Sequence, residues 1–145
     1  KAYIFFFFFV KSPTENKIAV FYNKADRIEF YSNDKLLKII QSQDGFSPIM
    51  QVTKVEEGGF YVEECDKTIY AHLSTSYTEK YIYSLYSGNN ETTSNKILVF
   101  DWEGHFIKEL SLDRKVSKIF VDGKRNFLYC YEIQGNGIYS VNLNF

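Results

Sequence analysis

The sequence predicts an all-β fold made of β-propeller blades of four antiparallel strands, with three blades in the chain. Aromatic residues make up 19% of the sequence, with 14 Phe and 12 Tyr, and such residues fit a pleated, buried surface better than a helix. No stretch of helical length carries apolar residues at the i, i+3, i+4, i+7 spacing. Short strands and polar turns instead recur with a period of about 45 residues, which is typical of propeller blades.

Three units share one order of strands and turns. In each, an apolar strand leads through a polar turn (SPTEN, TSYTEK or DGKRN) into a second strand (KIAVFY, KYIYSLY or NFLYCY). A variable loop and a third strand follow (RIEFYS, KILVFDW or GIYSVNL), and the first two units add a fourth strand (LLKII or FIKEL). A sandwich or a barrel also contains short strands, but neither requires the same four-strand order in every unit.

The repeat divides the chain into blades. Blade one spans about residues 1–43, blade two about 66–112 and an incomplete blade three about 113–145, which together are half of a six-bladed propeller. A hairpin at about 46–65 is inserted between the first two blades, where EEGG joins MQVTKV to FYVEEC. Propellers complete their last blade with a strand from the opposite end of the ring, so we expect the N-terminal segment of a partner to supply the fourth strand of blade three.

The opening segment AYIFFFFFV, residues 2–10, is apolar throughout. It is too short for a membrane-spanning helix, which needs about 20 residues. KSPTENK follows without a small-residue cleavage site, although a vestigial secretion signal remains an alternative. Because neighbouring blades cover both faces of a blade, an inner strand needs no polar alternation. We therefore expect this segment to be the first strand of blade one, covered on both faces.

Charge and cysteine content limit the function classes. Seventeen basic and 18 acidic residues give a net charge of −1, without a clustered basic face, which excludes a nucleic-acid partner. Cys65 and Cys130 permit one disulfide but make no metal spacing. Two buried free thiols are the simpler interpretation.

The segments around YIYSLYSG and KILVFDWEGHFIKELSLDRKVSKIFVD resemble the TolB-like six-bladed propeller proteins of Bacteroidetes. The similar positions are 79–88, 97–104, 112–116 and 120–122. The resemblance extends from about Asn16 onward and corresponds to the C-terminal half of those proteins. It implies the propeller fold and export to the periplasm or cell surface, but it implies no activity, and the chain carries no complete export signal.

Three blades form an arc with an open, apolar sheet face at each end. Soluble proteins seldom expose such faces. We expect a second copy of the chain, or a missing half of the propeller, to cover them, and a two-fold pair of arcs would close a ring of six blades.

Candidate ligand-binding residues lie in the loops between second and third strands and between successive blades, which build one mouth of the channel. They are Asn23, Lys24, Asp26, Arg27, Asn89, Asn90, Asp113, Arg114 and Asn136. Ordinary turn chemistry is the simpler interpretation of each polar residue, because Asn, Asp and Gly favour turns for backbone reasons. The Asp113–Arg114 pair offers a guanidinium fork for a carboxylate, or an ion pair between blades.

Enzyme signatures are absent from the sequence. It contains no G-x-S-x-G, no H-E-x-x-H and no phosphate loop. Of the two histidines, His72 could face the channel from an inner strand, and His105 lies in a turn. We therefore expect a non-catalytic binding module for a small molecule, glycan or protein at the channel mouth or outer rim, with no cofactor, metal or transmembrane segment. The alternatives are a metal-dependent, lactonase-like hydrolase and a remnant of a longer propeller protein.

Overall fold

The computed structural model describes residues 6–42, 45–135 and 137–144, and the regular structure in them consists of β-strands alone, which confirms the all-β prediction. The first sheet has the order β1 (Phe7–Lys11), β2 (Lys17–Tyr22), β3 (Ile28–Ser32) and β4 (Lys35–Ile40). The middle sheet has the order β7 (Tyr70–Tyr77), β8 (Tyr81–Asn89), β9 (Ser94–Asp101) and β10 (Phe106–Val116). The third sheet contains β11 (Lys118–Asp122), β12 (Phe127–Glu132) and β13 (Gly137–Asn142).

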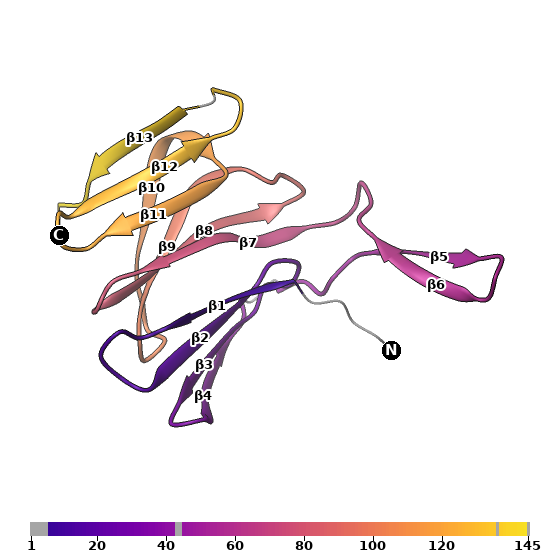
Figure 1. Cartoon of the computed structure of the whole chain (residues 1–145), viewed down its shortest axis with the longest axis horizontal. Coiled ribbons are helices and arrows are strands. Elements are labelled where there is room, and N and C mark those ends of the chain that lie inside the picture. Colours follow the sequence, from indigo (N-terminus) through magenta and orange to yellow (C-terminus); the bar gives the residue numbers. More distant parts are fainter. Residues whose placement is uncertain (1–5, 43–44, 136, 145) are drawn as a thin grey trace.

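The three sheets stack in chain order, with the middle sheet between the other two (Figure 1). All pairs of neighbouring strands are antiparallel. The turns that join the first two strands of each sheet lie along one edge of the stack, on the left of Figure 1. The loops between second and third strands are therefore at the opposite edge, because each second strand runs from one edge to the other.

The middle sheet is apolar on both sides because it has a neighbour on both sides. On β8, Ile82 packs into the core shared with the first sheet, whereas Tyr83 and Leu85 pack into the core shared with the third. On β9, Phe100 packs into the core shared with the first sheet, and Val99 packs into the core shared with the third. Alternating side chains point to opposite faces of a strand, so a strand buried on both faces shows no polar alternation.

The opening strand corrects one expectation. Its described part begins at Phe6, so most of the predicted strand before β1 lies outside the described residues. Val10 is buried against the middle sheet, but Phe7 and Phe9 are 53% and 69% exposed. The prediction that both faces of this strand are covered is therefore wrong among the described residues, where the first sheet packs on the middle sheet with one side and no described element covers the other.

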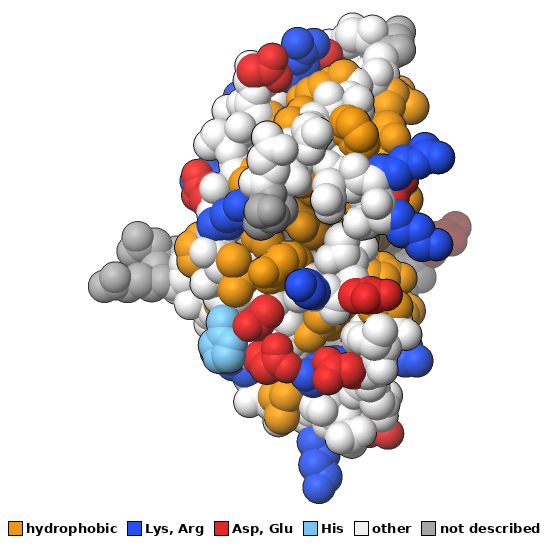
Figure 2. All heavy atoms as spheres, turned by 90° about the vertical axis from the view of Figure 1, so that its left-hand side faces the viewer, with side chains coloured by type: hydrophobic (Ala, Val, Ile, Leu, Met, Phe, Trp, Pro, Cys, Tyr) orange, Lys and Arg blue, Asp and Glu red, His pale blue; other side chains and the backbone are white. Residues whose placement is uncertain are grey.

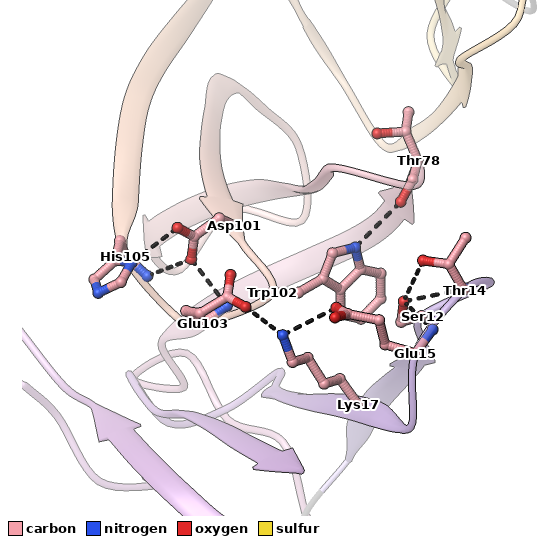
Figure 3. A network of polar contacts seen from close by, with 9 residues as sticks. All are labelled: Ser12, Thr14, Glu15, Lys17, Thr78, Asp101, Trp102, Glu103 and His105. Carbon is pink, nitrogen blue, oxygen red and sulfur yellow. Dashed lines mark hydrogen bonds and ion pairs between the residues drawn. The ribbon is translucent and has the colours of Figure 1, made fainter.

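The turn between β9 and β10 contacts the first sheet and links it to the middle sheet (Figure 3). Asp101 Oδ1 accepts hydrogen bonds from the backbone N–H of Glu103 at 2.9 Å and of His105 at 2.8 Å. The Trp102 ring is buried in the core between the two sheets, and its Nε1–H donates to the carbonyl of Thr78 at 3.2 Å. Figure 3 also shows Lys17, on β2 of the first sheet, which pairs with Glu103.

The inserted hairpin stands apart from the sheets. β5 (Gln51–Val55) pairs with β6 (Gly59–Glu63), and Figure 1 shows it projecting away from the stack. Gly58 takes a φ of 83° in its turn, and Phe60 is 72% exposed.

The remaining sequence expectations concern thiols and membrane spans. Cys65 and Cys130 are both free thiols. Cys130 is buried as expected, whereas the expectation of burial is wrong for Cys65, which is partly exposed. In the described part of the chain, no helix has the length and apolar character needed to span a membrane.

Candidate functional site

The predicted binding residues of the β2–β3 loop are committed to contacts inside the chain. The Asn23 side-chain amide donates to the carbonyl of His72 at 2.8 Å, and the Asn23 carbonyl accepts from the N–H of Ala71 at 2.7 Å. Lys24 is buried, and its ammonium group lies 2.6 Å from a carboxylate oxygen of Glu64. The loop therefore braces the first sheet against the segment that enters the middle sheet.

Asp26 in the same loop is buried as well. It accepts hydrogen bonds from the backbone N–H of Ser42 at 3.3 Å and from the Ser42 hydroxyl. Burial, together with the nearby Asp26 carboxylate, raises the pKa of Tyr86 to about 12. Asp26 thus holds the end of the first sheet beside the middle one, rather than facing open solvent.

The β8–β9 loop holds its own conformation. The Asn89 side-chain oxygen accepts from the Ser87 hydroxyl and from the backbone N–H of Glu91, both at 2.8 Å. Asn90 is exposed beside it. This is the turn chemistry expected of Asn. The predicted residue Asn136 lies outside the described residues.

Asp113 and Arg114 lie within β10, rather than in a connection between blades. The hydrogen bond from Arg114 lowers the pKa of the Asp113 carboxyl. Arg114 also reaches the third sheet, where its guanidinium lies 3.8 Å from the Glu132 carboxylate and 4.7 Å from the centre of the Tyr139 ring. Of the two roles considered for this pair, the contacts match the ion pair between blades.

His72 lies in the core, where it is 1% exposed. Its Nδ1 is 2.7 Å from the Ser84 hydroxyl, and its ring packs against Phe21 at 5.1 Å and Tyr86 at 5.4 Å between centroids. Complete burial lowers the pKa of His72 to about 3, so the imidazole is neutral at physiological pH. Within residues 6–42, 45–135 and 137–144, no three His, Cys, Asp or Glu side chains are grouped as a metal site requires.

Within the described part of the chain, no other element packs on the outer side of the first sheet. Cross-strand partners share a face, so the pairings of β1 to β4 place one set of side chains on the side away from the middle sheet. We call this set the first outward face: Phe7, Phe9, Lys11, Ile18, Val20, Tyr22, Glu29, Tyr31, Leu36 and Ile39. Four of its apolar side chains, those of Phe7, Phe9, Leu36 and Ile39, are between 43% and 69% exposed.

A buried carboxylate lies in the middle of the first outward face. Glu29 is 8% exposed and accepts hydrogen bonds from Tyr31 at 2.6 Å, from Arg27 at 2.7 Å and from Tyr22 at 3.2 Å. Burial raises the pKa of the Glu29 carboxyl, but the hydrogen bonds from Tyr31 and Arg27 outweigh burial, and the pKa lies below its ordinary value. The charge is therefore satisfied inside the face, and this accounts for Arg27, another predicted binding residue.

The third sheet has a matching unpartnered side. The pairings of β11 to β13 place Lys118, Phe120, Asp122, Phe127, Tyr129, Tyr131, Ile138, Ser140 and Asn142 on it, and we call this set the third outward face. Phe120 and Ile138 are 61% and 72% exposed. Phe120 and Phe127 both pack on the Tyr129 ring, with centroids at 6.3 and 6.4 Å.

A groove of about 860 Å³ adjoins the third outward face. It lies between the β7–β8 turn and the β11–β12 turn, and Lys80, Tyr81, Phe120 and Lys124 are among its lining residues. Figure 2 views this edge of the molecule, where charged side chains of both signs surround exposed hydrophobic ones. Phe120 belongs to both features, so a structure packed on the third outward face would also bound the groove.

Sequence reasoning placed the candidate ligand-binding residues in the loops and expected the open sheet faces to be covered by a second copy or a missing half of the propeller. The signal for the faces was present, because β1 and β2 alternate Phe, Ile, Val and Tyr with no polar side. That pattern shows that both faces suit burial, but it does not show whether both are covered.

Comparison with known families agrees with this architecture of four-stranded antiparallel sheets. The sequence model of the family described as "TolB-like 6-blade propeller-like" matches residues 1–124. The chain belongs to this family. The match includes the whole first and middle sheets of this TolB-like chain and reaches the turn after β11.

Further comparisons give distant similarity. Among solved structures, the TolB-like chain is similar to the structure of the Neurospora crassa Pan2 WD40 domain, with 14% identity and a TM-score of 0.30. The alignment covers 92% of this chain and 48% of that one, so the chain spans about half the length of the structure it matches. The curated proteins give no match.

Proposed function

We propose that this TolB-like chain is a non-catalytic interaction module that binds blade-like β-sheets through its first and third outward faces. The observation that carries the proposal is a difference in burial at equivalent positions. Ile28 on β3 and Ile97 on β9 are 3% and 0% exposed, because each faces the next sheet. Ile138, at the same position on β13, is 72% exposed.

The strand registers establish this equivalence. The second strands of the three sheets are β2, β8 and β12, and their fifth residues are Phe21, Leu85 and Tyr131. These residues pair with Ile28, Ile97 and Ile138, in the same order. The other side of the sheets shows the same difference in burial between equivalent positions. Ile119 on β11 is 6% exposed, whereas Phe9, at the same position on β1, is 69% exposed. Each outward face is thus built like a face that is buried elsewhere in the chain.

The chemistry of the first outward face also favours binding a sheet. Tyr and Arg are frequent at the energetic centres of protein interfaces, and Tyr22, Tyr31 and Arg27 surround Glu29 here. A buried charge disfavours association when it lacks a partner. The Glu29 carboxylate already has its partners, so an apolar surface can cover it without leaving a charge unpaired.

Both histidines and Asp101 make structural contacts in the described residues, which favours a non-catalytic module. His72 is neutral and enclosed by rings in the core. Asp101 fastens the β9–β10 turn, and its other carboxylate oxygen lies 2.8 Å from Nδ1 of His105.

Light scattering coupled to gel filtration tests the proposal. We expect the chain to form a species larger than the 17.0 kDa of one chain at micromolar concentration. Phe9→Glu or Ile138→Glu places a charge on one outward face and should abolish that species. Phe60→Glu is the matched control, because Phe60 is equally exposed but lies on the projecting hairpin. A wild-type chain that remains a monodisperse 17.0 kDa monomer overturns the proposal.

A further inference from the structure

The inserted hairpin presents an open sheet edge outside the stack. We infer that β6 of this hairpin binds an extended segment of a partner protein, which adds to its free edge as a third strand and carries alternating apolar and basic residues. This inference goes beyond the proposed function, because it concerns a different surface and a different partner.

The hairpin has unused capacity for strand pairing. β5 and β6 pair with no other described strand, and neither contributes a residue to the two hydrophobic cores. A hairpin of two strands alone has marginal stability in water. Val52, Phe60 and Tyr61 are all exposed on it. A third strand would cover both these side chains and the free backbone groups of the edge.

The base of the hairpin is anchored to the stack. The Thr68 hydroxyl is buried, accepts a hydrogen bond from the N–H of Cys65 at 2.9 Å and donates to the carbonyl of Ile49 at 2.8 Å, so it joins the two ends of the hairpin. Glu64, directly after β6, lies 2.6 Å from the ammonium of buried Lys24. A binding strand that is already held in place loses less conformational freedom when a partner binds.

The hairpin lies to the side of the direction in which the sheets stack. It leaves the stack at the edge that carries the β2–β3 and β8–β9 loops, whereas the two outward faces are at the ends of the stack (Figure 1). Further sheets on either outward face would lengthen the stack and leave this edge open. The edge of β6 is therefore available whether or not other sheets complete the propeller.

The two strands of the hairpin differ as edges. β5 carries Lys54, and a Lys on an edge strand opposes pairing with another chain. β6 has the sequence GFYVE and contains neither Lys nor Pro. The free edge of β6 is therefore the one suited to strand addition, a common way in which proteins bind extended peptides.

The side chains of β6 indicate the chemistry of the partner. Phe60 and Val62 lie on one side of the hairpin, and Tyr61 and Glu63 lie on the other. Alternate residues of an added strand would lie beside these two sets. Apolar residues suit the first set. A Lys or Arg suits the second, because it can pair with the Glu63 carboxylate and lie over the Tyr61 ring.

The charge of the hairpin also favours a basic partner. Between Gln51 and Glu63 there are three acidic residues, Glu56, Glu57 and Glu63, and one basic residue, Lys54. Among the described residues, none of these four side chains forms an ion pair. Complementary charge attracts a basic segment to this surface and disfavours an acidic one.

Peptide binding to the full chain tests the inference. The probe is a labelled peptide in which Val and Lys alternate, and the control has Glu in place of Lys. We expect fluorescence anisotropy to show binding of the Val–Lys peptide alone. Two further peptides carry backbone N-methyl groups, one on every Val and the other on every Lys. Alternate N–H groups of an added strand point to its neighbour, so one methylated peptide should bind and the other should not.

Variants of the chain locate the site. Phe60→Glu should weaken binding of the Val–Lys peptide by about fivefold or more, because an apolar cross-strand contact is lost. Glu63→Lys should reverse the preference between the two peptides, and a gain of binding cannot come from loss of folding. Phe9→Glu, on the first outward face, is the control and should bind like the wild-type chain. This variant separates the inference from the proposed function, because it damages an outward face and leaves the hairpin intact.

Three results would overturn the inference. No binding of the Val–Lys peptide, or equal binding of the two methylated peptides, would show that β6 adds no strand. Tighter binding of the Val–Glu peptide by the wild-type chain would place the added strand beside Lys54 on β5. A lower mass of Phe60→Glu in light scattering would show that the hairpins of two copies pair with each other. The first two results leave the proposed function intact, because they do not involve the outward faces.

Discussion

The middle sheet and the first sheet have the same strand order and similar apolar content. However, neighbouring sheets cover both sides of the middle sheet, whereas the described residues cover one side of the first. Ser84 on β8 and Val20 on β2 occupy equivalent positions, and the small polar residue is fully buried while the valine is half-buried. Burial here is decided by the neighbour of a strand and not by its own composition. The consequence is that stability should depend on the inward sides of the sheets, and association on the outward faces.

Truncating the shared core should have the largest effect on stability. Phe21 is fully buried where the first and middle sheets meet. We expect Phe21→Ala to lower the free energy of unfolding by about 3–5 kcal/mol, through lost burial and the cavity left behind. Urea unfolding at one fixed protein concentration measures it. Phe60→Ala on the hairpin is the control and should change the value by less than about 0.5 kcal/mol. Equal losses in the two variants would contradict the distinction between inward and exposed positions.

The β9–β10 turn offers a sharper test of the contact between these sheets. Gly104 has a φ of 78°, and a Cβ there would lie 2.8 Å from the Phe30 ring, whereas Gly58, with a φ of 83°, has open space around it. Both substitutions to Ala carry the backbone cost of a positive φ, about 1–2 kcal/mol. Gly104→Ala should add overpacking, for a total of about 2–4 kcal/mol. Thermal unfolding of the two variants should therefore separate them, and identical losses would show that the turn does not press on the first sheet.

Acid should weaken the contact through His72. Its pKa is about 3 in the folded chain against an ordinary value of 6.5, so the unfolded chain binds the proton first as the pH falls. The contribution of neutral His72 to the free energy of unfolding is complete above pH 6.5 and is lost progressively between pH 6.5 and 3. At pH 5 the loss is about 2 kcal/mol. His72→Gln should remove this part of the pH dependence of urea unfolding. His105→Gln, in the exposed turn, should retain it, and an unchanged slope in His72→Gln would refute the assignment.

Local chemistry explains how much of the structure could be predicted. The turn SPTEN lies between β1 and β2 as predicted, and the turns predicted at TSYTEK and DGKRN fall at the β7–β8 and β11–β12 connections, although residues 75–77 and Asp122 belong to the strands. Pro, Asp, Gly and Asn shape such turns by local backbone and side-chain effects. The roles of Lys24 and Asp26 could not be predicted. Their partners, Glu64 and Ser42, are distant in sequence, and a polar loop residue looks the same whether it faces a ligand or braces a neighbouring sheet.

The sequence alone determined the all-β class, the strand order within each sheet and the two-sided apolar character of the strands, because these follow from side-chain type and local spacing. Tertiary structure alone decided which of those sides are covered. Whether a side of a sheet is buried depends on whether another sheet packs on it. His72 and Phe21 lie on sides that face another sheet and are buried, whereas Phe9 and Ile138 lie on outward faces and are exposed.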